Sequence, residues 1–319
     1  MRRAPRARQL GVALVLVMWA SVLLTVVATS FILERRTESM IVHNSISLAR
    51  AEAAADAGVQ RGVMEMYRGD ITSPGIWKRD GTPQEWTFDG IPVRVELRDE
   101  SAKIDINTAA DPLLRGLLVT SGFNEEEATQ VLDAILDWRD PDSLKRPNGA
   151  EEADYRAAGL TYKPANSQFQ AIEELQLVLG MRPEIYRRLA PYITVFSRQP
   201  GVNALLASRE VLLSIPGITT EMVDQYLAKR DEARKQNLPA PTFPQAGPFA
   251  SGNTMVATVR SEARLGDGTI FAREAVAILR PVPRRPVTFV AWRESTASPP
   301  EPTNPQPQPA AAALPPGKS

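Results

Sequence analysis

The 319-residue sequence contains no cysteine and only one histidine, His43, and its formal charge at neutral pH is zero. Without cysteine there can be no disulfide, no thiolate zinc ligand and no cysteine nucleophile. A single histidine leaves no histidine-rich metal site and argues against a hydrolase that depends on histidine. The equal numbers of basic and acidic side chains argue against a protein that binds polyanions over its whole surface. Together these absences argue against a conventional enzyme.

Charge is also missing from one long stretch near the N-terminus, Gln9–Leu33. A helix of about 20 apolar residues crosses the core of a bilayer, so this stretch predicts a membrane span. Four arginines and no acidic residue precede it, and by the positive-inside rule they keep the N-terminus in the cytoplasm. The alternative is a secretory signal cleaved near Val26-Val27-Ala28, but the apolar core of such a signal is normally shorter. The length therefore favours a span.

The helical pattern continues beyond the span. Apolar residues recur at steps of seven, four and three residues, at Ile41, Leu48, Ala55, Val59, Val63 and Met66. This spacing is typical of one face of an amphipathic helix. No proline or turn cluster occurs before Gly69, so we expect one helix of about 55 residues, half in lipid and half amphipathic.

The N-terminal segment resembles that of type IV pilin-like proteins, which carry a short basic leader, a glycine before the cleavage point and an apolar helix. The junction Arg8-Gln9-Leu10-Gly11 followed by Val12 is similar to that pattern. The resemblance implies that a prepilin peptidase cuts after Gly11, so that the mature chain starts at Val12. The fifth mature position is then Leu16, where most pilins carry a glutamate that neutralises the amino terminus of a neighbouring subunit. A subunit without this glutamate has less reason to lie beneath another one.

Alternating apolar and polar residues predict a few strands on either side of a long helical region. A half-buried strand is expected at Ile91–Arg98, and a hairpin around the turn Gly266-Asp267-Gly268 is expected from residues 255–260 and 270–276. A further strand is expected at Val287–Trp292. Residues 101–236 have helical patterns almost throughout, so the sequence predicts a small α+β head interrupted by a helical insertion.

The insertion contains a weak internal repeat in which apolar residues precede a glycine turn and a second amphipathic helix follows. The turns are Ser121-Gly122-Phe123, Pro216-Gly217-Ile218 and Leu179-Gly180-Met181. The unit resembles the helix-hairpin-helix, which in nucleic-acid proteins offers backbone N–H groups to a phosphate. However, residues 101–236 hold 16 basic and 20 acidic side chains, which would repel a phosphate backbone. The second glycine of the usual turn is also replaced, so we expect the repeat to be scaffold.

Carboxylates are concentrated in one segment, residues 137–154, which we call the acidic segment. It reads Asp137-Trp138-Arg139-Asp140-Pro141-Asp142, and then Asn148-Gly149-Ala150-Glu151-Glu152-Ala153-Asp154. Carboxylates gathered on a loop repel one another unless a cation or proton intervenes, and calcium accepts six to eight oxygens in flexible geometry. The EF-hand spacing is absent. Three alternatives remain open: a solvated acidic loop, the pairing of Asp137 and Glu151 with Arg139, Lys145 and Arg146, and a hydrolase with paired carboxylates.

A wider set of motifs resembles one family. These are Ile104-Asp105-Ile106-Asn107, Ile135-Leu136-Asp137-Trp138-x-Asp140-x-Asp142, Asn148-Gly149-Ala150-Glu151, Pro164-Ala165-Asn166 and Glu173-Glu174-Leu175. Their order is similar to that in the K-type minor pseudopilin of the type II secretion system, over roughly residues 1–293, and this subfamily lacks the pilin glutamate. The resemblance implies a structural calcium site in the insertion and a place at the tip of a periplasmic pseudopilus. The family's acidic motif maps onto Asp140, Asp142, Glu151, Glu152 and Asp154.

The sequence thus predicts a non-enzymatic minor pseudopilin of α+β, type IV pilin-like fold, with a long N-terminal helix, a small antiparallel sheet and a large all-helical insertion. The expected segments are a leader (1–11), a span (12–33), an amphipathic helix (34–68), the two parts of the head (69–100 and 237–297), the insertion (101–236) and a disordered proline-rich tail (298–319).

The resemblance implies a single-pass inner-membrane protein with its bulk in the periplasm. Its expected partners are the I- and J-type minor pseudopilins, inner-membrane secretion components, prepilin peptidase and the lipid bilayer, with no nucleic acid. The alternative is a membrane-anchored DNA receptor that uses the helix-hairpin-helix repeats, and a salt-dependent retention on DNA would favour it.

Overall fold

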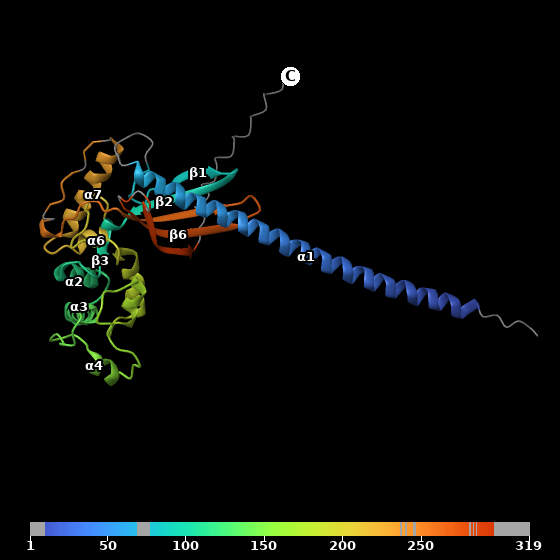
Figure 1. The fold of residues 1–319 in the computed structure, drawn as a ribbon, viewed down its shortest axis with the longest axis horizontal. Helices are drawn as coiled ribbons and strands as arrows, with labels where there is room; N and C mark the ends of the chain where they lie inside the picture. The colour runs from blue at the N-terminus through green and yellow to red at the C-terminus, as the bar shows by residue number, and fades with distance from the viewer. Residues whose placement is uncertain are drawn as a thin grey trace, which may run out of the picture.

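A computed structural model describes residues 10–68, 77–236, 238–239, 241–244, 247–280, 282, 284 and 286–296. Most of the predicted leader and the whole proline-rich tail lie outside the described residues, whereas Gly11 and Val12 lie in the first turn of the N-terminal helix. Figure 1 shows this helix running far out from a head, with the insertion gathered at the opposite end of the molecule.

The first element is a continuous helix, α1 (Leu10–Tyr67), of 58 residues. At a rise of 1.5 Å per residue it is about 87 Å long. Its C-terminal part is buried against the sheet at Ala51, Ala54, Ala55, Val59, Val63 and Met66. The predicted single helix is therefore confirmed, but the predicted apolar stripe is only partly buried within this chain. Ile41 and Leu48 remain exposed because they precede, or face away from, the part of α1 that reaches the sheet.

Within the described residues, an antiparallel sheet has the strand order β1-β2-β5-β6-β7. Its strands are β1 (Gln84–Phe88), β2 (Ile91–Asp99), β5 (Val256–Arg264), β6 (Ile270–Leu279) and β7 (Val287–Ser295). One face of β2, β5 and β6 packs on α1. The helix comes close because it presents Gly58 there: a Cβ at Gly58 would lie 2.1 Å from Oγ of Ser261. The predicted α+β architecture of a long N-terminal helix on a small antiparallel sheet is confirmed.

The insertion leaves the sheet after β2 and returns before β5. Its helices are α2 (Asp111–Thr120), α3 (Glu125–Arg139), α4 (Glu152–Ala157), α5 (Pro183–Leu189), α6 (Arg209–Leu213) and α7 (Thr220–Lys235). Short 3₁₀ helices lie at η1 (Glu100–Ala102), η2 (Ile172–Leu177), η3 (Ala190–Tyr192) and, beyond the insertion, η4 (Gly247–Phe249). A core separate from that of the head holds these elements together.

The insertion is not helical throughout. β3 (Ile104–Asp105) pairs in parallel with β4 (Ile193–Thr194), which joins the two ends of the lobe that contains α2 to α5. The glycines of the predicted repeat, Gly122, Gly180 and Gly217, all have positive φ and each precedes a helix. The turns therefore need glycine, while the helix-hairpin-helix assignment stays a prediction.

Buried acids connect the sheet to the insertion. Asp99, at the end of β2, accepts hydrogen bonds through Oδ1 from the backbone N–H of Ser101 at 2.9 Å and from the hydroxyl of Thr254 at 2.8 Å. Glu100 accepts hydrogen bonds from the hydroxyls of Thr258 in β5 and Thr194 in β4, and Lys103 lies 2.9 Å from its Oε1. Because each buried carboxylate accepts hydrogen bonds from both sides of the boundary, the insertion has a defined position on the sheet.

Candidate functional site

The acidic segment starts inside α3, whose N-terminus is well defined. The side chain of Asn124 accepts a hydrogen bond from the N–H of Glu127, whose carboxylate accepts one from the N–H of Asn124, a reciprocal capping box. Near its C-terminus, α3 buries Trp138 against Phe169, with ring centroids 6.0 Å apart. The same turn carries Asp137 into the interior, where it is fully buried.

Arg146 is the partner of the buried Asp137. Its Nη1 lies 2.8 Å from Oδ1 of Asp137 and also donates a hydrogen bond to Oδ2 of Asp140. These two hydrogen bonds raise the pKa of Arg146, so the guanidinium stays charged. The close packing requires Gly149, because a Cβ there would lie 1.9 Å from Oδ2 of Asp137. The predicted pairing of Asp137 with a basic residue of this segment is confirmed for Arg146.

Two of the predicted ligands have a buried oxygen that no described group satisfies. These atoms are Oδ1 of Asp140 and Oε1 of Glu151, neither of which has a hydrogen-bond partner among the described residues. Burial raises the pKa of Glu151, and the nearby carboxylates of Asp137, Asp140 and Asp142 raise it further. The chain therefore brings Asp140, Asp142 and Glu151 into one electrostatic neighbourhood in which a further cation would be stabilising.

Two further predicted ligands, Asp154 and Glu152, have lysine or arginine partners. Asp154 lies 2.6 Å from Nζ of Lys145, and this hydrogen bond lowers the pKa of Asp154. Glu152 lies 2.6 Å from Arg156 and 3.5 Å from Lys163. Over the residues that the structure describes, no three carboxylate or imidazole side chains are arranged to hold a metal ion. The donor chemistry suits calcium at Asp142, Glu151 and Oδ1 of Asp140, whose Oδ2 is paired with Arg146, while Glu152 and Asp154 would first have to leave their ion pairs.

The structure adds residues that were not among the predicted ligands. Asn166 donates a hydrogen bond from Nδ2 to the backbone carbonyl of Asp142, which ties the acidic segment to the following loop. Asn166 has positive φ, a conformation that asparagine tolerates better than most residues. The motif Pro164-Ala165-Asn166 marked this position in the sequence, but its spacing could not show what the amide contacts.

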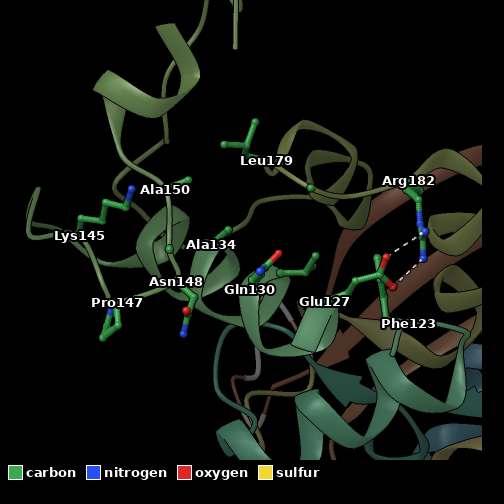
Figure 2. Close-up of a pocket in the computed structure, with 13 residues that line it drawn as sticks. Phe123, Glu127, Gln130, Ala134, Lys145, Pro147, Asn148, Ala150, Leu179 and Arg182 are labelled. Atoms are coloured by element: carbon green, nitrogen blue, oxygen red, sulfur yellow. Dashed lines mark hydrogen bonds and ion pairs between the residues drawn. The ribbon is translucent and has the colours of Figure 1, made fainter. Parts of the chain in front are cut away.

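A groove of about 470 Å³ runs beside the acidic segment. Figure 2 shows Lys145, Pro147 and Asn148 along one side of it, while Glu127 and Arg182 form an ion pair on the other. Glu127 is the only carboxylate among the groove's lining residues, and it lies 3.4 Å from Arg182. The groove thus does not present the two facing carboxylates that the alternative of a hydrolase requires.

The second functional element is the N-terminal part of α1. It contains an apolar window of mean hydropathy 2.3 in which no residue is buried within the chain, long enough to cross a membrane. Large side chains such as Leu23, Trp19 and Phe31 are more than half exposed. A surface this apolar requires a lipid or protein environment. Leu16, which would be the fifth residue of a chain cut after Gly11, is also exposed.

Comparisons with known proteins agree with one another. The family model "Type II secretion system (T2SS), protein K" matches residues 95–198. The chain is 28% identical to type II secretion system protein K of Pseudomonas aeruginosa over 69% of this chain and 73% of that protein. It is 32% identical to that of Dickeya chrysanthemi, over 40% of this chain and only 37% of the relative.

A solved structure shows the same fold. The match covers 82% of this chain and all of a chain of the GspK–GspI–GspJ complex from the type 2 secretion system of enterotoxigenic Escherichia coli. Its TM-score is 0.58 at 15% sequence identity.

Proposed function

We propose that the chain is a minor pseudopilin of the protein K type, which it resembles in its family match, its relatives and its fold, and that it forms the tip of a periplasmic pseudopilus. In this position it would assist the export of folded proteins across the outer membrane. Before assembly, α1 would anchor it in the inner membrane with the head in the periplasm. Relatives are named as parts of a secretion system rather than as enzymes, and the proposed role is structural.

One observation carries this proposal: a single helix provides both an unpacked apolar rod and the core of the head. Residues from Ala51 to Met66 are buried by the sheet, whereas the large apolar residues before them are exposed. An ordinary membrane anchor does not need to continue into the core of its domain. A helix that leaves the bilayer to pack beside the helices of other subunits does need to continue into the head, because the head must move with the helix as one rigid unit.

The position of the insertion supports a place at the end of a filament. It lies at the end of the molecule opposite to the N-terminus of α1, as Figure 1 shows. There it would cover the surface on which a further head would have to stack. Leu16 supports the same position, because a subunit without the pilin glutamate cannot neutralise the amino terminus of a subunit above it.

The partners follow from the proposed position. The solved relative was crystallised with two further proteins of its system, GspI and GspJ, and we propose that I- and J-type minor pseudopilins pack along α1 here. A photo-crosslinking amino acid at Leu24 or Val42, both exposed, tests this in cells that contain the whole system. We expect adducts with the I- and J-type subunits that disappear in strains lacking them. Adducts with phospholipid alone would contradict the proposal.

Processing after Gly11 is also part of the proposal. Prepilin peptidase would leave Val12 as the first residue of the mature chain. Mass spectrometry of the N-terminal peptide from cells should find this end, and should find the full leader in a strain without the peptidase. An N-terminus elsewhere, for example after Ala28, would instead indicate a secretory signal.

We further propose that calcium binds the acidic segment through Asp140, Asp142 and Glu151. Calcium would neutralise carboxylates that now repel one another, and it would satisfy the buried oxygens of Asp140 and Glu151. Asp154 could bind the ion only after its ion pair with Lys145 had broken, and Glu152 only after its ion pairs with Arg156 and Lys163 had broken.

A calcium titration of the full chain in detergent tests this site. At 100 times its dissociation constant a bound ion adds about 2.7 kcal/mol to the free energy of unfolding, so the melting temperature should rise by several degrees. Asp142→Asn and Glu151→Gln should remove this rise. Asp224→Asn should keep it, because Asp224 is exposed on α7 and pairs with Arg209 of α6, outside the acidic segment. The site is wrong if calcium has no effect or if Glu151→Gln keeps the full rise.

A further inference from the structure

A second cavity, of about 230 Å³, lies where the insertion meets the sheet. Its walls come from the segment before β1, from β2, from the turn after η1 and from α6 and α7. We call it the junction cavity. Two carboxylates, Asp80 and Asp99, line it together with five basic side chains: Arg79, Arg98, Lys103, Arg230 and Arg234.

Two of the five cations are already paired outside the cavity. Nζ of Lys103 lies 2.9 Å from the carboxylate of Glu100, and Nη2 of Arg98 lies 3.2 Å from that of Glu96. At these distances the ion pairs are close hydrogen bonds. These two residues therefore contribute less to the positive potential of the cavity than their number suggests.

The other three arginines have only distant acidic neighbours. The shortest nitrogen–oxygen distances are 3.9 Å from Arg79 to Asp99, 3.5 Å from Arg234 to Asp80, and 4.0 Å from Arg230 to Asp231. Each is longer than the usual charge-assisted hydrogen bond. Part of the positive charge of these guanidinium groups is thus uncompensated, and Arg79 and Arg230 are largely sheltered from water.

Arg230 is the clearest case. Its side chain is 11% exposed, and its Nη1 donates hydrogen bonds to the carbonyl oxygens of Ala204 and Ala207 at 3.1 and 2.8 Å. Its Nε is buried and has no hydrogen-bond partner among the described residues. A buried donor without an acceptor costs free energy, and an incoming acceptor would recover it.

We propose that the junction cavity binds a small oxyanion, a phosphate, sulphate or carboxylate group, between the sheet-side Arg79 and the pair Arg230 and Arg234 of α7. Guanidinium groups bind such anions through planar, bidentate hydrogen bonds. The volume lies below the range of about 300–1,000 Å³ that is usual for drug-sized ligands, so a small anion fits better than a nucleotide. Asp99 and Asp80 also line the cavity, 3.9 Å from Arg79 and 3.5 Å from Arg234, so the anion would compete with these two carboxylates for the arginines.

The anion would connect two parts of the chain. Arg79 belongs to the head, where its Nη2 donates to the carbonyl oxygen of Met66 at the end of α1. Arg230 and Arg234 belong to the insertion. An anion held by both sides would therefore stabilise the insertion on the head through binding to the folded state. This inference depends neither on the calcium site nor on the proposed place in the filament.

Inorganic phosphate is the first probe. The full chain in detergent, without added calcium, is titrated with sodium phosphate by isothermal calorimetry and thermal unfolding, while sodium chloride keeps the ionic strength constant. We expect saturable heat and a saturable rise in melting temperature. Sodium acetate in a parallel titration distinguishes the two kinds of anion: an equal effect indicates a carboxylate site, and a weaker one indicates a preference for tetrahedral oxyanions.

Matched arginine variants locate the site. Arg230→Gln and Arg234→Gln should each weaken phosphate binding by about tenfold or more, the loss expected for one hydrogen bond to a charged group. Arg209→Gln should bind phosphate as the unaltered chain does, because Arg209 pairs with Asp224 on the surface and does not line the cavity. Circular dichroism checks that each variant is folded. If Arg230→Gln is not, the partly exposed Arg234 carries the test.

Two results would overturn the proposal. One is the absence of any saturable effect of phosphate and of acetate beyond that of sodium chloride. The other is saturable binding of phosphate that Arg234→Gln leaves unchanged in a folded variant.

Discussion

The C-terminal half of α1 packs on the sheet mainly through small residues, whereas the N-terminal half exposes large apolar side chains. Toward the C-terminus, the face against the sheet consists largely of Ala51, Ala54, Ala55, Gly58 and Gly62. Toward the N-terminus, exposed leucine, valine, phenylalanine and tryptophan predominate. Small residues let a helix and a sheet approach closely, while large apolar residues provide contact area for lipid or for another helix.

The comparison teaches that the continuity of a helix and its burial have different causes. Both halves lack internal proline and keep their backbone hydrogen bonds within the helix, so α1 forms without interruption. Only one half has its surroundings supplied by the same chain. The N-terminal half needs lipid or other proteins to cover it. Four substitutions test this difference, beginning with the largest expected effect.

A charge in the exposed half should disrupt membrane insertion. Leu23→Arg places an arginine near the middle of the apolar stretch, where insertion should become less favourable by about 3 kcal/mol. The fraction of chain that stays with membranes after alkaline extraction should fall strongly. Met40→Arg is the control, because Met40 is similarly exposed but lies beyond the apolar stretch. Equal retention of both variants would mean that the N-terminal half does not span a bilayer.

A larger side chain in the packed half should destabilise the head. Ala54 has no exposed surface, and Ala54→Leu should lower the free energy of unfolding by about 2 kcal/mol through overpacking against the sheet. Denaturant unfolding of the full chain in detergent measures the loss. Ala20→Leu makes the same change in the exposed half and should leave the stability of the head unaltered. A similar loss in both variants would remove the distinction between the halves.

The packed half is also held by charge. Arg273 in β6 reaches α1, where its guanidinium lies 2.6 Å from Glu52 and 2.7 Å from Asp56. Arg273→Gln should lower the free energy of unfolding by about 1.5 kcal/mol, because Arg273 is largely buried. The exposed surface pair of Arg209 with Asp224 is the control, and Arg209→Gln should cause no measurable change. A stability loss no larger than the control's would make the Arg273 contacts incidental.

The smallest effect is expected at the boundary between the halves. The hydroxyl of Ser47 donates a 2.5 Å hydrogen bond to Asp267 in the turn between β5 and β6, and this bond is the first cause of a pKa of about 2 for Asp267. A lowered carboxyl pKa adds stability above the ordinary value of 3.8, and that stability is lost as the pH falls through about 2. Ser47→Ala should therefore raise the pKa of Asp267 toward 3.8, measured by carbon NMR of the carboxyl group. An unchanged pKa would show that Ser47 does not hold this turn.

Much of the fold could be predicted from the sequence because its period-two and helical patterns are long. β2, β5, β6 and β7 lie where alternation predicted strands, and α1 extends as far as the unbroken helical pattern. β1 was missed because its burial does not alternate cleanly. The pairing of β3 with β4 could not be found, since two residues show no period and their partners lie far away in the sequence.

The candidate site was predictable in composition but not in pairing. The sequence shows which carboxylates lie close along the chain, whereas their partners depend on how the loop folds. Thus Asp137 is buried with Arg146, and Asp154 pairs with Lys145, although both acids come from the same segment. The unsatisfied oxygens of Asp140 and Glu151 follow from burial, which no spacing of acidic residues reveals. The junction cavity draws its arginines from distant segments and left no motif.

The contact of Ser47 with Asp267 also sets a mechanical condition. Together with His43, whose Nε2 lies 3.8 Å from the same carboxylate, it marks the last place where the described residues of the head hold α1, and the helix continues beyond His43 toward Leu10 for about 50 Å. This part of α1 projects from the hairpin turn, so a small change in the helix angle at the turn causes a large displacement of the N-terminal end. The direction of the N-terminal part of α1 relative to the head therefore depends on the rigidity of the few contacts at this turn.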